Sequence, residues 1–359
     1  MSRQIRAVYC HRYAGLDEAG APRATPEPLR KVLKLESIAA PDCQAESVLV
    51  QVHYAGVQFP DALQAQGLYQ VKPPLPYVPG MDVSGTVLEV GAGVSHVVPG
   101  DRVIAQRTVP QAMVGSMAEQ IISPADHVWK APEGVPLAAC ANMSRNYFAA
   151  YYPLKILGEV KAGDLVLIDG ASGGVGMAAI ELAKAMGAAV IAGVSTPDKQ
   201  AGPESAGADR VLCYGRDRDS YKAFKGAVRQ ASAELGHPEG VDVVVDMVQG
   251  DLFEGALLSA IRPMGRICLV GFTAGQKPIR PGLILIKQAV IMGSTWVPWA
   301  RSNPEDHQQN VAEILGWLAS GVIKPRADRI FPLANYIEAF ELYENNQGRG
   351  NTVVCFQED

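Results

Sequence analysis

Residues 165–187 read LVLIDGASGGVGMAAIELAKAMG: an apolar run, a glycine-rich turn and a helix-forming segment. In such a unit the free N–H groups and the positive dipole end of the helix face the turn and can hold a pyrophosphate. A second apolar run, 188–194, completes a βαβ unit. The turn has the pattern AxGxxG, in which alanine is tolerated at the first position if its φ is negative. We therefore predict a dinucleotide site at Ala171, Ser172, Gly173, Gly174, Val175 and Gly176.

Composition limits the class of protein. The chain has 359 residues, enough for two domains of roughly 100 to 200 residues each, and 48% of its residues are hydrophobic. Its net charge of −5 and the lack of a long basic run argue against a nucleic-acid partner. The start lacks a secretory signal, and the most apolar later segment, 283–292, is short and contains Lys287. We expect a globular protein that does not enter a membrane.

The six cysteines are scattered singly, which is neither a disulfide framework nor a metal-ligand spacing. We expect each to be a small buried apolar residue. This usage suits a reducing compartment and predicts a cytoplasmic location.

Two patterns of secondary structure divide the chain. Before residue 150, short apolar runs at 47–54, 83–91 and 102–105 are typical of closely spaced β-strands. From about 150 to 290, strands alternate with helices, and apolar runs such as 241–246 and 266–271 resemble strands buried on both faces. After residue 290 we expect a helix at 305–320 and a strand at 352–356, and between 14 and 28 a long surface loop.

Besides the glycine-rich turn, several short blocks are spread over nearly the whole chain: GVQFPD (56–61), GLY (67–69), PGMDVSG (79–85), PGDRV (99–103), AYY (150–152), GAD (207–209) and PL (332–333). Their order resembles that of the medium-chain dehydrogenases/reductases, specifically the zinc-free NADPH:quinone oxidoreductase branch that includes ζ-crystallin. The resemblance implies an α/β fold with a GroES-like, mostly β catalytic domain (1–148 and 291–359) and a Rossmann domain with a doubly wound parallel sheet (149–290). It also implies a homodimer.

Zinc-dependent relatives carry a Gly-His-Glu block where this chain has Gly80-Met81-Asp82, and no four-cysteine lobe is present. Because zinc needs Cys, His and carboxylate ligands at matched positions, we expect no metal. His53, His96 and His127 are then interpreted as surface or strand residues.

Charge after the second strand of the βαβ unit indicates which coenzyme is bound. NAD enzymes place an acid there for the ribose 2′-hydroxyl, whereas this chain continues with Ser195-Thr196-Pro197-Asp198-Lys199. We expect Ser195 and Lys199 to bind the 2′-phosphate of NADPH, although Lys199 could instead be a solvated turn residue. The resemblance adds Tyr214 beside that phosphate, and we also expect coenzyme contacts from Gly271 and Phe272.

Without a metal, the reaction must make mild demands on the protein. An activated double bond can accept hydride at carbon while charge spreads to its carbonyl, so quinones, enones and enoyl compounds are favoured. By resemblance, Gln58, Asp61 and Tyr69 line the catalytic site, and Gln58 replaces the asparagine of the family. Tyr69 is either the proton donor or an aromatic wall that makes packing contacts only. Asp61 more often caps the following helix than takes part in chemistry.

Tyr151 and Lys155 form a YxxxK spacing like that of short-chain dehydrogenases, but the pair precedes the glycine turn. We expect Pro153 to interrupt the helix that would align them. Trp296 and Trp299 could wall the acceptor site or pack in a core.

The sequence therefore predicts an NADPH-dependent, metal-independent reductase of quinones or α,β-unsaturated carbonyl compounds. Because a fold does not establish activity, a non-catalytic NADPH-binding protein of the crystallin kind is the alternative. A zinc-dependent alcohol dehydrogenase is disfavoured.

Overall fold

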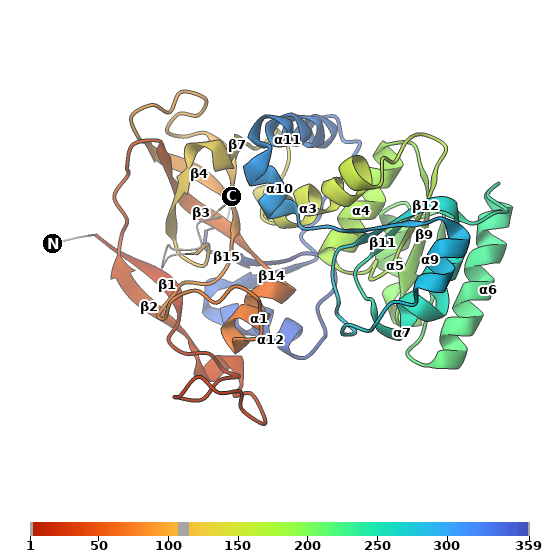
Figure 1. Ribbon diagram of the computed structural model, residues 1–359. Coiled ribbons are helices and arrows are strands. Elements are labelled where there is room, and N and C mark those ends of the chain that lie inside the picture. The colour runs from red at the N-terminus through yellow and green to blue at the C-terminus, as the bar shows by residue number, and fades with distance from the viewer. Residues whose placement is uncertain (1–2, 107–114, 358–359) are drawn as a thin grey trace. The chain divides into compact units, whose positions relative to one another are not determined.

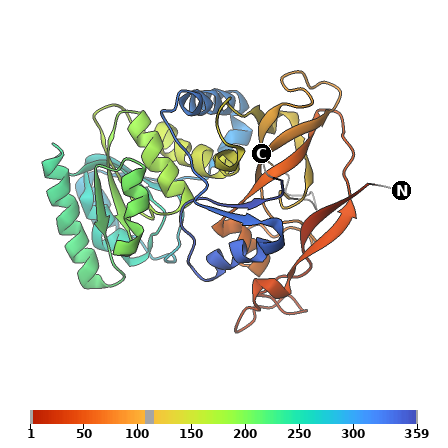
Figure 2. The same cartoon turned by 180° about the vertical axis from the view of Figure 1, so that it is seen from behind.

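The computed structural model describes residues 3–106 and 115–357, which form two units (Figures 1 and 2). The first unit contains Met1–Arg145 and Pro325–Asp359, and the second contains Asn146–Lys324. The chain thus leaves a mostly β unit, forms a parallel-sheet unit and returns. The predicted α/β class with these two kinds of domain is confirmed.

A largely antiparallel sheet forms the first unit, in the order β14-β15-β3-β4-β5-β7, with β6 also paired to β3. The C-terminal strand β15 lies antiparallel beside β3, as Figure 1 shows in blue and orange. Because β3 is valine-rich and almost entirely buried, it forms the centre of this unit. The strands are β1 (Gln4–Cys10), β2 (Leu33–Ala39), β3 (Ser47–Val57), β4 (Asp82–Val90), β5 (Arg102–Gln106), β6 (Gln120–Pro124), β7 (Val128–Lys130), β14 (Arg329–Pro332) and β15 (Thr352–Cys355).

Short helices position the functional loops of this unit. Helix α1 begins directly after β3 and ends at Gly67, whose left-handed φ of 74° stops the helix. Helix α12 contributes Phe340 to the same core as β3. The helices are η1 (Leu29–Lys31), α1 (Phe59–Gln66), η2 (Ala125–His127), α2 (Leu137–Cys140), η7 (Leu333–Asn335) and α12 (Tyr336–Glu344), and η3 (Met143–Phe148) crosses the boundary into the second unit.

Six parallel strands form the sheet of the second unit, in the order β10-β9-β8-β11-β12-β13. This is the doubly wound order in which the chain changes direction between its first and fourth strands, here β8 and β11. The expected Rossmann architecture is confirmed. The strands are β8 (Leu165–Ile168), β9 (Ala189–Val194), β10 (Arg210–Cys213), β11 (Val241–Asp246), β12 (Ile261–Leu269) and β13 (Val290–Gly293).

Helices cover both faces of this sheet (Figure 1). Leu165 and Leu167 of β8 pack with Phe224 and Val228 of α6 on one face. Helix α4 packs along β8 and β9 and contacts α3. The helices are α3 (Ala149–Tyr151), η4 (Tyr152–Leu157), α4 (Gly174–Ala185), η5 (Pro197–Lys199), α5 (Ala201–Ser205), α6 (Arg218–Glu234), α7 (Gly250–Leu252), η6 (Phe253–Leu257), α8 (Leu258–Ala260), α9 (Pro281–Lys287), α10 (Trp296–Ser302) and α11 (Pro304–Ala319).

The return to the first unit comes later in the chain than the sequence indicated. We expected residues 291–359 to belong to the β domain, but the structure groups residues up to Lys324 with the parallel sheet. The reason is that β13 extends that sheet, and α10 and α11 pack on the aromatic segment after Asn146. The first boundary lies at 145/146 rather than 148/149.

Burial of the cysteines is only partly as expected. Cys10, Cys140 and Cys268 are buried, but the other three cysteines are partly exposed. The expectation that every cysteine is buried is wrong for Cys43 and Cys213 and for Cys355 of β15.

Candidate functional site

The glycine-rich turn joins β8 to α4 at the carboxyl edge of the parallel sheet. Gly170 adopts a φ of 56°, whereas Ala171 is not among the residues with positive φ. The condition under which alanine replaces the first glycine of the motif is therefore met. Helix α4 begins at Gly174 after Gly173, and no side chain caps its first N–H groups. These donors and the positive end of the helix dipole can bind an anionic group.

The three glycines of this turn differ in what a side chain would meet. A Cβ at Gly176 would lie 2.6 Å from the Cα of Ala171, and one at Gly174 would lie 2.5 Å from the Asn146 amide nitrogen. At Gly173 the nearest atom is the Gly170 carbonyl oxygen at 3.5 Å, so a methyl group fits there. A side chain would collide with backbone at Gly176 and with the buried Asn146 side chain at Gly174, so the fold disfavours both, whereas the open space above Gly173 suits a pyrophosphate close to the backbone.

Ser195 and Tyr214 follow the neighbouring strands β9 and β10, and the structure brings these two predicted residues together. The Tyr214 hydroxyl is hydrogen-bonded to Ser195. Tyr214 is only 6% exposed and packs edge-on against Phe224, with 5.7 Å between ring centroids. Burial, and secondarily Asp169, raises the pKa of Tyr214. Lys199 ends η5, in the segment that Ser195 begins, and is half-buried. This corner can hold a phosphate.

Gly271 and Phe272 lie in the loop after β12, at the same edge of the sheet. Gly271 approaches the loop after β11 so closely that a Cβ would lie 3.0 Å from the Met247 carbonyl oxygen. The Phe272 side chain is 43% exposed. Both residues thus lie in a loop at the carboxyl edge of the parallel sheet, the edge that also carries the glycine-rich turn. The Phe272 side chain is exposed enough to contact a ligand there.

In the first unit, Gln58 and Asp61 open helix α1. An Asp61 carboxylate oxygen accepts the Gln58 backbone N–H at 2.8 Å, so Asp61 has the expected capping role. The Gln58 amide nitrogen donates to the Asn142 side-chain oxygen at 2.9 Å, and Asn142 donates onward to the Thr352 carbonyl at 3.1 Å. Gln58 is therefore fixed by a buried chain of amide bonds that sequence reasoning did not foresee.

Asp61 also belongs to a buried charge cluster with Arg145 and Asp82. An Arg145 guanidinium nitrogen lies 2.5 Å from an Asp61 oxygen, and their side chains are 12% and 1% exposed. Asp82 accepts the Arg145 backbone N–H at 2.7 Å and the Ser144 hydroxyl. Burial raises the pKa of Asp82 to about 6, against the lowering effect of Arg145. Burial disfavours the charge on Arg145, but Asp61 and Asp82 outweigh it and raise the Arg145 pKa, with a smaller contribution from Tyr69.

Tyr69 lies half-buried in the loop between α1 and β4. The N-terminal segment holds this loop, since Cys10 and Tyr77 exchange backbone hydrogen bonds of 2.8 and 3.1 Å. The Tyr13 hydroxyl adds a bond to the Pro73 carbonyl. The loop that contains Tyr69 is therefore fixed by hydrogen bonds to β1 and to the segment that follows it.

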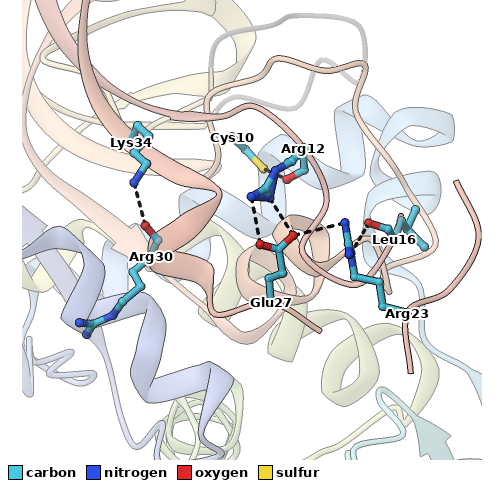
Figure 3. Close-up of polar contacts among 7 residues, drawn as sticks. All are labelled: Cys10, Arg12, Leu16, Arg23, Glu27, Arg30 and Lys34. Carbon is cyan, nitrogen blue, oxygen red and sulfur yellow. Dashed lines mark hydrogen bonds and ion pairs between the residues drawn. The ribbon is translucent and has the colours of Figure 1, made fainter. Parts of the chain in front are cut away.

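The predicted loop at 14–28 contains no helix or strand along its described length, as expected. Figure 3 shows how it closes on itself: Arg12 binds both Glu27 oxygens at 3.0 Å, and Arg23 reaches Glu27 at 3.3 Å. Arg23 also donates to the Leu16 carbonyl at 2.8 Å. The loop is thus an ordered support beside Tyr13.

Trp296 and Trp299 pack against aromatic residues of the second unit. Trp296 meets Phe148 at 6.0 Å between ring centroids, and Trp299 meets Tyr152 at 5.0 Å. These rings line a shallow depression that is itself almost closed by side chains. Packing accounts for both tryptophans.

The expectation that Pro153 would misalign Tyr151 and Lys155 is wrong. The chain continues through Pro153 as the π-helix η4, and both side chains reach Glu313 of α11. The Tyr151 hydroxyl donates to this carboxylate, and the Lys155 ammonium lies 3.6 Å from it. The pair is engaged in binding Glu313, which explains it structurally.

Comparisons with known proteins agree with this geometry. Residues 44–133 match the alcohol dehydrogenase GroES-like domain, and residues 174–315 match the zinc-binding dehydrogenase model. Bovine quinone oxidoreductase-like protein 2 is 34% identical over 331 residues, which cover 92% of this chain and 90% of that protein. The chain belongs to the quinone oxidoreductase branch of the medium-chain dehydrogenases/reductases.

Two further proteins are similar to this chain over nearly their whole length. Human quinone oxidoreductase is 33% identical over 326 residues, covering 90% of this chain and 93% of that protein. A mycobacterial protein solved in complex with NADPH is 27% identical with a TM-score of 0.80, covering 98% of this chain and 99% of the other. The resemblance inferred from the sequence blocks is confirmed.

The residues that could bind a metal ion are dispersed or engaged in other contacts. In residues 3–106 and 115–357, no group of three or more His, Cys, Asp or Glu side chains could hold a metal ion. Asp82 of the Gly-Met-Asp block instead binds Ser144 and the Arg145 backbone. His53 contacts the Thr86 hydroxyl at 3.1 Å and His96 the Val128 carbonyl at 3.0 Å. Within the same described residues, no helix is long and apolar enough to span a bilayer.

Sequence reasoning missed two residues that contact the predicted site residues: Asn142, which binds Gln58, and Arg145, which binds Asp61. Both lie in the run ANMSRN, which carries no motif, and each acts through a partner more than 80 positions away in the chain. Arg145 is the only charged residue between Glu133 and Lys155, and this was the available signal, because a buried arginine requires a carboxylate partner.

Proposed function

We propose that this protein is an NADPH-dependent oxidoreductase that transfers a hydride to quinones or α,β-unsaturated carbonyl compounds without a metal ion. The observation that carries the proposal is the open backbone at Gly173 before an uncapped helix, next to a phosphate corner with no acid directly after β9. The names of the bovine and human relatives and the NADPH complex of the mycobacterial structure support it.

The coenzyme supplies the hydride, and the residues of this chain bind and orient the reactants. The first N–H groups of α4 bind the pyrophosphate, and Ser195 and Lys199 bind the 2′-phosphate. Negative charge that develops on the acceptor oxygen receives a hydrogen bond and then a proton from Tyr69. Arg145 places a fixed positive charge within electrostatic range of that hydroxyl. One hydride and one proton thus reduce one double bond, and Tyr69 regains its proton from solvent.

The test is the loss of reduced-nicotinamide absorbance with a panel of ortho- and para-quinones, enones and enoyl thioesters. We expect acceleration with at least one class, and unchanged activity after dialysis against a strong chelator. If NADPH binds but no acceptor is reduced, the protein is a non-catalytic NADPH-binding protein instead. Stoichiometric zinc in active protein would support an alcohol dehydrogenase.

Replacing Tyr69 with phenylalanine tests the proposed proton donor. We expect kcat to fall by about 100-fold, as is typical when a general acid is removed. The KM for NADPH should stay unchanged, because the ring and the loop contacts of Cys10 and Tyr13 remain. Steady-state kinetics measure both constants, and an unaltered kcat would show that Tyr69 is only an aromatic wall.

Replacing Lys199 with alanine tests the coenzyme preference. The ammonium group favours the extra phosphate of NADPH, so we expect the ratio of NADPH to NADH affinity to fall about tenfold. Isothermal titration of both nucleotides measures the ratio. Asp198→Ala is the matched control, because removing its carboxylate should leave or increase NADPH affinity. Equal losses for both coenzymes would contradict a role at the phosphate.

We further propose that the protein is a cytoplasmic homodimer joined through the edge of its parallel sheet. Strand β13 is the last strand of that sheet, and α9 exposes Leu285 and Ile286 at 79% and 76%. An unpaired edge strand beside exposed apolar side chains favours self-association. We expect Leu285→Glu with Ile286→Glu to yield monomers in light scattering, whereas Leu88→Glu, on the other unit, should not. A monomeric parent protein would contradict the proposal.

A further inference from the structure

Two buried carboxyl groups meet where the parallel sheet changes direction. Strands β8 and β11 are adjacent, and their register pairs Val245 with Ile168. Asp246 and Asp169 are the next residues of the two strands, and both are 0% exposed. Ligands of doubly wound sheets bind outside this point of reversal. The two acids therefore lie beneath the proposed coenzyme site.

Each acid uses one oxygen to bind the backbone of the loop after β11. Asp169 accepts the Met247 N–H at 2.6 Å, and Asp246 accepts the N–H groups of Val248 at 3.0 Å and Gln249 at 2.8 Å. The second oxygen of each accepts no N–H or hydroxyl donor from the described residues. These two oxygens can be satisfied by one another if a single proton lies between them.

The charges support this arrangement. Burial raises the pKa of Asp169 well above its ordinary value, and neighbouring Asp246 raises it further. Burial also raises the pKa of Asp246, while the hydrogen bond from Asp169 lowers it. The pair as a whole thus holds one proton and carries one negative charge. Tyr214 after β10 is a further titratable group that interacts with Asp169. Two ionised carboxylates in contact would repel strongly in this dry surrounding.

The pair stabilises an unusual backbone conformation. Gln249 has a φ of 55° and a ψ of −141°, a backbone region that is unfavourable for any residue other than glycine. Its N–H is one of the two that Asp246 accepts. The loop after β12 is bonded to the same backbone, since the Ala274 N–H donates to the Val248 carbonyl at 3.0 Å. Three loops at the coenzyme edge, those after β8, β11 and β12, are therefore joined through this pair.

We propose that Asp169 and Asp246 share one proton and act together as a positioning pair for the coenzyme, fixing the loops after β8, β11 and β12. This inference rests on the proposed function only in assigning the coenzyme to these loops. Loss of the shared proton sets two like charges side by side, moves the loops apart and weakens NADPH binding. Affinity for the coenzyme accordingly falls as the pH rises through the ionisation of the pair.

The sign of the pH effect follows from proton linkage. Because burial raises the pKa of Asp169 in the folded chain, its proton stabilises the fold fully at pH values below the pKa of the unfolded chain. This stabilisation is lost as the pH rises from the pKa of the unfolded chain to that of the folded chain. Asp169→Asn keeps an acceptor for Met247 and an amide donor for Asp246 but cannot ionise. Between these two pKa values, the folding equilibrium constant of the parent protein should fall by up to tenfold for each pH unit, relative to that of Asp169→Asn.

The experiment measures three quantities across pH in the full chain. Carbon-13 NMR of labelled aspartate should show one carboxyl that stays protonated at neutral pH, absent in Asp169→Asn. Chemical denaturation and NADPH titration should both show alkaline losses in the parent that Asp169→Asn reduces. Asp217→Asn is the control of opposite sign. Hydrogen bonds from Ser220 lower the pKa of the Asp217 carboxyl, so the stability that Asp217 contributes is lost at acid pH rather than at alkaline pH.

Each outcome separates the claims. Ordinary titration of both carboxyls, or identical pH profiles for the parent and Asp169→Asn, would overturn the shared proton. A shared proton with the same pH dependence of NADPH affinity in both proteins would overturn the positioning role. If the parent binds no NADPH at any pH, the proposed function fails while the NMR and stability results still decide the shared proton.

Discussion

NADPH affinity is expected to fall about tenfold or more when Gly173 is replaced by alanine, while the stability of the protein stays within about 0.5 kcal/mol. The backbone at Gly173 has an ordinary extended conformation, and an added methyl group meets no atom closer than 3.5 Å. The methyl would instead occupy the space in which the pyrophosphate approaches the first N–H groups of α4. Fluorescence titration of NADPH and thermal unfolding measure the two effects.

Two other glycines serve as controls for this prediction. Gly226 lies within α6, where a Cβ meets nothing within 4 Å, so Gly226→Ala should leave NADPH affinity unchanged and raise stability by about 0.5–1 kcal/mol. Gly176→Ala should lower stability and affinity together, because the new Cβ would collide with the backbone of Ala171. Unchanged affinity in Gly173→Ala would mean that the turn does not bind the coenzyme.

Much of the parallel-sheet unit was predictable because its strands and helices are encoded locally. The apolar runs at 165–168 and 241–246 became β8 and β11, and the helix expected at 305–320 became α11 (Pro304–Ala319). The glycine turn was recognisable for the same reason: a strand, a turn and a helix follow one another directly within residues 165–185. The order of the blocks then identified the family.

Features that depend on distant contacts were not predictable from periodicity. Residues 291–324 belong to the parallel-sheet unit because the tryptophans of α10 and α11 pack on Phe148 and Tyr151. The alignment of Tyr151 with Lys155 depends on a π-helix. Pro153 lies in the first turn of this helix, where the N–H that proline lacks would have no partner within the helix. Asn142 and Arg145 gain their significance only from partners brought close by the fold.

Asp61 is expected to have the largest effect on stability. Asp61→Asn keeps an oxygen that can accept the Gln58 N–H but removes the charge that pairs with buried Arg145. Breaking a buried ion pair by neutralising one partner costs about 3–5 kcal/mol, since the remaining charge stays desolvated. Urea denaturation should therefore show a loss of this size, and acceptor turnover should fall with it because the Arg145 side chain is no longer fixed beside Tyr69.

The partner substitution distinguishes an ion pair from a general requirement for Asp61. In Asp61→Asn combined with Arg145→Met, the buried cation is removed together with the charge that paired with it, and Asp82, whose pKa burial raises to about 6, keeps the Ser144 hydroxyl and the backbone N–H of residue 145. We expect the double variant to recover more than half of the lost stability. Arg30→Met is the matched control, because the Arg30 side chain is 62% exposed in its pair with Glu341, so losing that pair should leave stability nearly unchanged. Losses that simply add in the double variant would show that Asp61 and Arg145 act independently rather than as an ion pair.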